Sequence, residues 1–261
     1  MSSLHIRHLS HQYGLTEVLN NISLDLHSGE TLALVGPSGC GKSTLLHIIA
    51  GLLTPEHGLV QSHFQGVATV FQEPRLLPWK TAGANIALGL KALGLPKPAR
   101  HRLAEKMGRR LGLQPDDLQK YPHALSGGMQ SRVALGRALA ISPDLLLLDE
   151  PFSALDVGLK EEFYQLLTQQ SRQQGTAVLL ITHDLMEAVR LADRIVMMVP
   201  DPGRILHELA LTRPQHQRDT PWVYATLAEL MQTDIVRIGF GLAAGQVPAP
   251  VPHSHTEGCA L

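Results

Sequence analysis

The most constraining feature of this sequence is the segment at residues 36–44, which reads GPSGCGKST. It fits the phosphate-binding pattern G-x-x-x-x-G-K-[ST]. An apolar run at residues 31–35 precedes it, as expected of a strand buried on both faces, and a helical pattern of apolar residues follows it. Because a helix N-terminus carries unpaired N–H groups and a positive dipole end, this arrangement predicts a loop that binds a nucleoside triphosphate.

The residue types in this loop suit that role. Glycines let the backbone wrap closely around phosphates, Lys42 adds a positive charge, and Ser43 offers its hydroxyl to Mg²⁺. The nucleotide-binding residues expected in the loop are Gly36, Pro37, Ser38, Gly39, Cys40, Gly41, Lys42, Ser43 and Thr44.

Composition limits the remaining possibilities. A chain of 261 residues with 44% hydrophobic residues suits one α/β domain, alone or with a small extension. A net charge of −1 gives no general attraction to nucleic acid or to an anionic membrane. No apolar run approaches the roughly 18 residues that span a bilayer, and the N-terminus lacks signal-peptide character, so we expect a cytoplasmic location. Cys40 and Cys259 are too few for a disulfide framework.

Patterning along the chain predicts three parts. Alternating strands at residues 4–30 indicate an antiparallel β part, and apolar runs at 67–71, 145–149, 177–182 and 194–199 indicate a parallel sheet. Strand signals are absent between the runs at 67–71 and 145–149, so we expect a helical subdomain inserted at about residues 75–140. We assign residues 1–206 to one domain and 207–261 to a short C-terminal extension with one helix at 221–233 and a flexible tail from about 239.

Polar residues follow several of the buried strands directly. Gln72, Asp149-Glu150 and His183 each come at the carboxyl end of an apolar run. These ends meet at one edge of a parallel sheet, where ligands of open α/β folds bind. Beside a phosphate loop, Asp149 is the expected second Mg²⁺ partner, and Glu150 can orient or deprotonate the attacking water. Gln72 and His183 have a second interpretation as solvated loop residues, and Tyr13 either stacks on a base or packs in its turn.

Residues 125–129, LSGGM, resemble the LSGGQ signature of the ATP-binding subunits of ABC transporters, and the match extends over most of residues 4–206. The resemblance assigns Tyr13 to the base-stacking aromatic, Gln72 to the Q-loop and His183 to the switch histidine. It assigns residues 145–150 to the Walker B strand with catalytic Glu150, and residues 153–156 to the D-loop. It implies a P-loop NTPase cassette with a RecA-like core and an inserted helical subdomain, using ATP and Mg²⁺, with Gln72 joining Ser43 and Asp149 at the metal.

The same resemblance implies a dimer. Ser126, Gly127 and Gly128 precede a helix and form a second anion site, which in the family closes over the γ-phosphate held by the other subunit. A second copy of the chain is therefore an expected partner, with Lys42, Gln72, Glu150 and His183 taking part in catalysis. Met129 stands where the family has glutamine, and Ser131 replaces a glutamine that is common in the family two residues further on. Because the serine and glycines that touch phosphate are intact, we expect activity to survive.

Residues 72–79, QEPRLLPW, followed by NIALGL at 85–90, resemble the nitrate/sulfonate/taurine importer subfamily. This implies integral membrane permease subunits that dock beside exposed Leu76, Leu77 and Trp79, and indirectly a solute-binding protein. The chain would then sit peripherally on the cytoplasmic side of the inner (cell) membrane. In a second interpretation, the side chains of Leu76, Leu77 and Trp79 pack within the helical subdomain. Sulfonate, taurine and nitrate are the expected solutes, and a pyrimidine precursor is an alternative.

Two other classes of function compete with the importer. A soluble ABC-type ATPase acting on nucleic acid or ribosomes would need two cassettes or a long coiled-coil insertion, and also a basic face. A small-molecule kinase would not need Ser126, Gly127 and Gly128 or Glu150. We therefore expect no nucleic-acid partner. In the tail, His253, His255 and Cys259 could bind a soft metal, but a solvated tail is the preferred interpretation.

Overall fold

The computed structural model describes residues 2–153 and 155–240. The tail histidines and Cys259, for which metal binding was considered, lie outside the described residues. An antiparallel sheet of order β2-β1-β4 is built from β1 (Ser3–Tyr13), β2 (Thr16–His27) and β4 (His57–Ser62). The antiparallel N-terminal part is thus confirmed. Strand β4 was not predicted, because only Val60 in it is even half-buried and no apolar alternation marks it.

A second sheet forms the centre of the molecule, with strand order β5-β6-β7-β3-β8-β9. All neighbours in it are parallel except β9, which runs antiparallel to β8, so the predicted parallel core is confirmed. Its strands are β3 (Thr31–Val35), β5 (Val67–Val70), β6 (Leu145–Asp149), β7 (Ala177–Thr182), β8 (Arg194–Val199) and β9 (Arg204–Ala210).

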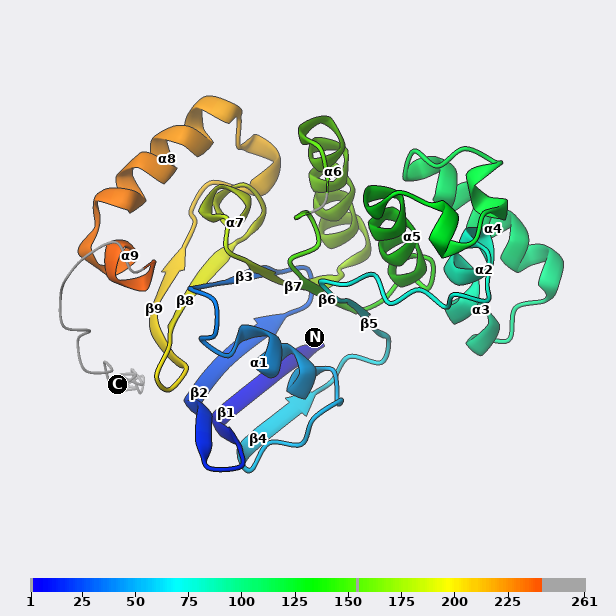
Figure 1. Cartoon of the computed structure of the whole chain (residues 1–261). Helices are drawn as coiled ribbons and strands as arrows, with labels where there is room; N and C mark the ends of the chain where they lie inside the picture. The colour runs from blue at the N-terminus through cyan, green and yellow to red at the C-terminus, as the bar shows by residue number, and fades with distance from the viewer. Residues whose placement is uncertain (1, 154, 241–261) are drawn as a thin grey trace, which may run out of the picture.

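Helices cover both faces of this sheet and one end of it (Figure 1). Helices α2–α5 gather beyond β5, and the segment between β5 and β6, which the structure describes throughout, contains no strand. The helices are α1 (Lys42–Ile49), α2 (Ala82–Ile86), α3 (Leu88–Ala92), α4 (Lys97–Arg110), α5 (Gly127–Leu139), α6 (Val157–Gln174), α7 (Leu185–Leu191), α8 (Thr220–Gln232) and α9 (Asp234–Gly239). Short 3₁₀ turns occur at Asp117–Gln119, Pro122–Ala124 and Gln215–Gln217.

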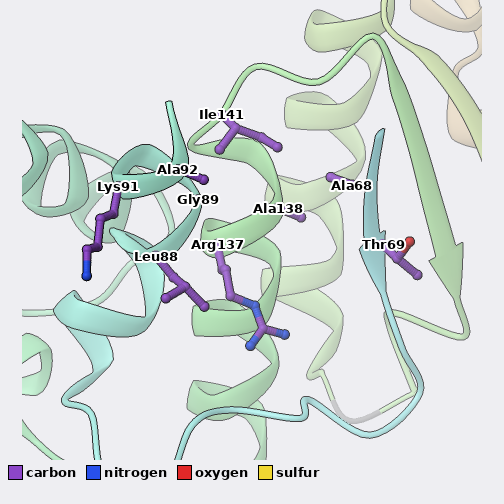
Figure 2. Close-up of a pocket in the computed structure, with 9 residues that line it drawn as sticks. All are labelled: Ala68, Thr69, Leu88, Gly89, Lys91, Ala92, Arg137, Ala138 and Ile141. Carbon is purple, nitrogen blue, oxygen red and sulfur yellow. The ribbon is translucent and has the colours of Figure 1, made fainter. Parts of the chain in front are cut away.

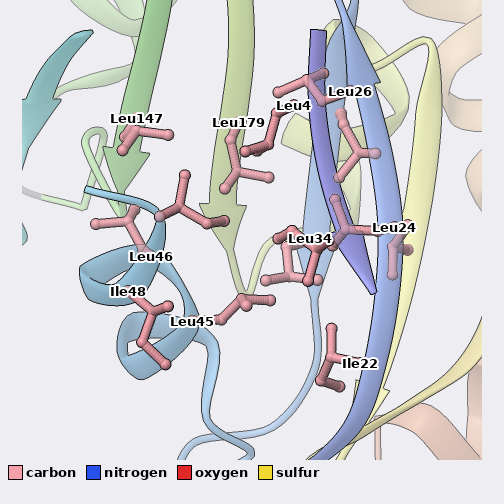
Figure 3. Close-up of a cluster of buried hydrophobic side chains, with 14 of the residues drawn as sticks. Leu4, Ile22, Leu24, Leu26, Leu34, Leu45, Leu46, Ile48, Leu147 and Leu179 are labelled. Atoms are coloured by element: carbon pink, nitrogen blue, oxygen red, sulfur yellow. The ribbon is translucent and has the colours of Figure 1, made fainter. Parts of the chain in front are cut away.

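The core explains why α1 and the loop before it are held firmly. Alternate residues of each central strand point to opposite faces, so Leu34, Leu147 and Leu179 face the small sheet while their neighbours face α5–α8. Figure 3 shows side chains from the small sheet, the large sheet and α1 meeting in one cluster. The labelled members are Leu4, Ile22, Leu24, Leu26, Leu34, Leu45, Leu46, Ile48, Leu147 and Leu179. Helix α1 is therefore fixed between the two sheets.

Within the described residues, no helix has the length and apolar character that crossing a membrane requires. The division of the chain into a domain at 1–206 and an extension from 207 stays a prediction.

Candidate nucleotide-binding site

The order of the central strands brings the predicted site segments to one edge of the sheet. Val70 of β5 lies opposite Leu148 of β6, Asp149 of β6 lies opposite Ile181 of β7, and Val35 of β3 lies opposite Thr182 of β7. Strands β5, β6, β7 and β3 therefore end side by side. Residues that are up to 147 positions apart, from 36 to 183, follow these ends directly.

The loop at residues 36–44 connects β3 to α1 and is tightly built on one side. A Cβ added to Gly36 would lie 2.4 Å from the carbonyl oxygen of Met198 in β8, so only glycine fits there. Lys42 is buried, and its Nζ donates to the carbonyl oxygens of Gly36 at 2.8 Å and Pro37 at 2.9 Å. A Cβ added to Gly39 would meet no atom within 4 Å, so the loop is open on that side.

Helix α1 begins without a side-chain cap. Gly41 is its N-cap in the left-handed conformation at φ 90°, and its first turn contains no acidic residue. Among the residues that the structure describes, no side chain caps the N–H groups of the first turn, and the positive end of the helix dipole lies at the same place. An anion such as a phosphate group suits this position.

Asp149 is the last residue of β6 and is buried. Burial raises the pKa of its carboxyl group, and the negative charge of Glu150 acts in the same direction, while a side-chain hydrogen bond from Ser43 and the positive charge of Lys42 lower this pKa. A buried carboxylate is costly unless it is paired or binds a cation. A carboxylate beside a hydroxyl is the oxygen-rich donor set that Mg²⁺ prefers, so these residues fit the metal that the fold implies.

Glu150 lies between two other predicted site residues. Its Oε2 accepts from Gln72 Nε2 at 3.4 Å, and its Oε1 is 3.3 Å from His183 Nδ1. The backbone of Glu150 is left-handed at φ 46°, and its N–H donates to the carbonyl oxygen of Ile181 at 3.0 Å. The structure thus brings Gln72, Glu150 and His183 together, with the turn after β6 tied to β7.

Tyr13 lies at the end of β1, with 51% of its surface exposed. Its ring makes an edge contact with His11, at 4.9 Å between the ring centroids. The proposed stacking on a base stays a prediction.

Ser126 and the two glycines after it lie in a different part of the molecule. Ser126 is the N-cap of α5, and its hydroxyl accepts from the N–H of Met129 at 3.3 Å. A Cβ added to Gly127 would meet no atom within 4 Å. Helix α5 packs on α2, α4 and β5, whereas α1 packs on β2 and β6 (Figure 1). The structure therefore does not bring Ser126 to the loop at 36–44 within one copy.

The two departures in the signature segment have local explanations. Met129 is partly buried against the cluster of the helical insertion that includes Leu125 and Val133. The Ser131 hydroxyl donates to the carbonyl oxygen of Gly127 at 3.2 Å. Both side chains thus act within the helical part of the same chain.

One part of the site was not predicted. Thr182 Oγ1 donates to Glu187 Oε2 at 2.6 Å, and Lys160 Nζ donates to Glu187 Oε1 at 2.9 Å. No spacing rule relates Lys160 to Glu187, because only the packing of α6 on α7 brings them together.

A groove of about 520 Å³ lies between the β5 edge, α3 and α5 (Figure 2). Arg137 lines it and donates to the carbonyl oxygens of Pro74 at 3.0 Å and Arg75 at 2.8 Å, in the segment that follows Gln72. Leu76 and Leu77 are half-buried rather than exposed, since Leu76 packs into two core clusters, whereas Trp79 is exposed as expected.

Comparisons with known proteins agree with this geometry. The family model described as "ABC transporter" matches residues 19–153. The taurine import ATP-binding protein TauB of Escherichia coli O6:K15:H31 (strain 536 / UPEC) is 44% identical over 215 residues, covering 80% of this chain and 84% of that protein. TauB of Shigella sonnei (strain Ss046) is 43% identical over the same shares.

Solved structures show the same fold. The dimeric post-hydrolysis state of the ATP-binding cassette MJ0796 bound to ADP and Pi matches with a TM-score of 0.74 and 30% identity, covering 80% of this chain and 99% of that chain. A structure of an ATP binding subunit of an ABC transporter matches with a TM-score of 0.73 and 26% identity, covering 86% and 99%. The predicted cassette fold is thus confirmed, and the chain belongs to the ABC transporter family.

Proposed function

We propose that this chain is the ATP-hydrolysing subunit of an importer for taurine or a related sulfonate. Its family membership makes it an ATPase coupled to transport. The single observation that carries the assignment of chemistry is the position of Glu150, held between Gln72 and His183 at the sheet edge that also carries the phosphate loop. Similarity to taurine import proteins supports the solute class.

Catalysis would rest on positioning and charge. Lys42 and the N–H groups at the start of α1 hold the β- and γ-phosphates, and Glu150 orients the attacking water or accepts its proton. His183 contacts the γ-phosphate, and Tyr13 stacks on the base. The remaining loop residues from Gly36 to Thr44 surround the phosphates with backbone N–H groups, except Pro37, which has no N–H to donate.

Ser43, Asp149 and Gln72 would hold Mg²⁺, because they offer hydroxyl, carboxylate and amide oxygens. When bound, the ion neutralises negative charge on the phosphates. Asp149 is buried, and an unpaired negative charge in a buried position is costly. Pairing with such a cation would lower this cost.

The partners follow from the two separate phosphate-binding elements. We infer that Ser126, Gly127 and Gly128 of a second copy complete the site, as the open surroundings of Gly127 permit.

The groove of Figure 2 would receive the permease subunits, since Arg137 links it to the segment after Gln72. A solute-binding protein would act through that permease, with this chain on the cytoplasmic side of the membrane.

Uptake of labelled solutes by cells tests the proposal. A strain that lacks this gene should lose uptake of labelled taurine or a short alkanesulfonate, and the wild-type gene should restore it while the Glu150→Gln gene should not. Uptake of labelled nitrate and of a pyrimidine precursor serves as the comparison. Loss of either of these with intact sulfonate uptake would replace the proposed solute class, and no loss of any uptake would contradict the importer itself.

A further inference from the structure

Glu187 of α7 is a buried carboxylate that accepts hydrogen bonds from two neighbouring segments. Thr182 at the end of β7 donates to its Oε2 at 2.6 Å. Lys160 and Tyr164 of α6 donate to its Oε1 at 2.9 Å and 3.5 Å. A buried ion pair of this kind adds little net stability compared with apolar packing, but it can fix one geometry among several.

Thr182 directly precedes His183, and its hydroxyl also accepts from the backbone N–H of Asp184 at 3.0 Å. The Thr182 hydroxyl thus fixes the residues before and after His183. His183 Nδ1 in turn lies 3.3 Å from Glu150 Oε1. Because His183 is largely exposed, with 65% of its side chain accessible, its direction depends on the backbone that carries it.

Glu187 is also connected to the start of α6, where Asp156 lies. Asp156 caps α6, since its Oδ1 accepts from the N–H of Leu159 at 2.9 Å, and its carbonyl oxygen accepts from the N–H of Lys160 at 2.9 Å. Lys160 therefore connects the start of α6 to Glu187, and Glu187 connects it to Thr182. Tyr164 also contacts the ring of Phe152 edge-on at 5.1 Å, which adds the segment after Glu150 to the same cluster.

We propose that Glu187 is a positioning residue for ATP hydrolysis: with Lys160, it holds residues 182–184 so that His183 stays on Glu150. The inference rests on the roles proposed above for Glu150 and His183. Glu187, Lys160 and Thr182 do not contact the loop at 36–44 through any side-chain hydrogen bond or ion pair found in the described residues. Their effect should therefore fall on the rate of hydrolysis rather than on the affinity for ATP.

The test uses the purified full chain and the variants Glu187→Gln, Lys160→Met and Thr182→Val. Each should lower kcat about tenfold, the size of one hydrogen bond to a charged group, and leave the Kd for ATP within about twofold. Lys160→Arg and Thr182→Ser keep the donors and should restore kcat to within about threefold of wild type. Glu161→Gln is the matched control, because this neighbouring carboxylate pairs with Arg190 and does not reach Thr182.

Two further measurements separate positioning from a general loss of structure. The double variant Lys160→Met/Glu187→Gln removes both charges of the pair, so it leaves neither charge unpaired and should fold even if a single variant does not. Its kcat should fall no further than that of the worse single variant. The NMR signals of the His183 ring should shift or broaden in the double variant at a temperature where it is fully folded, and stay unchanged in Glu161→Gln.

The outcomes also separate this inference from the proposed function. Glu150→Gln is measured in parallel. If it is inactive while Glu187→Gln, Thr182→Val and the double variant keep wild-type kcat, the inference is wrong and the proposed site stands. If Glu150→Gln hydrolyses ATP normally, the site assignment fails and the inference fails with it.

Discussion

The helix N-termini of α1 and α5 are both predicted to bind phosphate, and they differ in their surroundings. The loop before α1 is enclosed on the side of β8, where Gly36 abuts the carbonyl oxygen of Met198 and Lys42 is buried, and open on the other side at Gly39. The segment before α5 is open, since a side chain added at Gly127 would meet no atom within 4 Å. The first element has acidic and polar residues from three strand ends beside it, and the second has none of them.

This difference separates what one chain completes from what it offers to another. The enclosed loop needs only the fold of its own chain to hold phosphate. The open segment has the chemistry of an anion site but no ligand-binding neighbours, so a second molecule must supply the phosphate. Changes at the loop should therefore disturb nucleotide binding and folding in a single copy, whereas changes at residues 126–128 should disturb only the assembled pair.

The largest effect is expected for Glu150→Gln, which removes the proposed acceptor of the water proton. Hydrolysis should fall by about a thousandfold, and ATP should still bind, because the phosphate loop is untouched. Single-turnover hydrolysis and equilibrium ATP binding measure the two quantities. Glu73→Gln, an exposed carboxylate next to Gln72, is the control and should behave as wild type. Undiminished turnover in Glu150→Gln would remove Glu150 from its role.

Lys42→Ala and Ser126→Ala test the comparison directly through binding to single copies. Lys42→Ala should weaken ATP binding about a hundredfold, the value of a charged group donating to phosphate. Ser126→Ala should leave the affinity of the monomer unchanged, because Ser126 does not approach the loop of its own chain. Calorimetry at concentrations that keep the chain monomeric gives both values. Equal losses in the two variants would contradict the separation.

Alanine at two glycines should affect stability in opposite directions. Gly36→Ala places a Cβ 2.4 Å from a backbone oxygen and should lower the free energy of unfolding by about 3 kcal/mol. Gly127→Ala lies in open space at the start of α5 and should raise it by up to about 1 kcal/mol while still blocking hydrolysis by the pair. Urea unfolding measures both. A marked loss of stability in Gly127→Ala would show that its surroundings are not open.

The smallest expected effect concerns Asp149. Burial raises the pKa of its carboxyl, so the ionised form is less favourable in the folded chain than in the unfolded chain. The protonated form of Asp149 therefore stabilises the folded chain at low pH, and this stabilisation is lost as pH rises through the raised pKa. Asp149→Asn should therefore raise Tm at neutral pH without Mg²⁺, and abolish the Tm increase that Mg²⁺ with ATP gives wild type. A lower Tm without ligand would contradict the burial argument.

Continuous apolar runs made much of the fold predictable. The strands β3, β6 and β7 are buried along their whole length and stand out in the sequence. Strands β4 and β9 could not be predicted, because they lie at sheet edges, where most side chains are exposed or half-buried. Because both faces of these strands are exposed or half-buried, their sequences lack the alternation of apolar and polar residues that predicts a strand.

The candidate site was predictable in part. The acidic pair after β6 stands out because a charge beside a buried strand is unusual, and the glycine-rich loop has its own pattern. Gln72 and His183 have no such signal, and their approach to Glu150 depends on β5 and β7 flanking β6, an order that only the fold sets. Glu187 and Lys160 meet only because α6 packs on α7.

The measurement that tests the account most directly is a mixing experiment with two inactive variants, Lys42→Ala and Ser126→Arg. In a mixed pair, one site combines both defects while the other combines an intact loop with an intact Ser126 segment. Mixing equal amounts should therefore restore about a quarter of wild-type turnover, since half of the randomly formed pairs hold one complete site of two. If the mixture stays as inactive as either variant alone, while each variant keeps the Tm of wild type, the two elements do not join across copies and the account is contradicted.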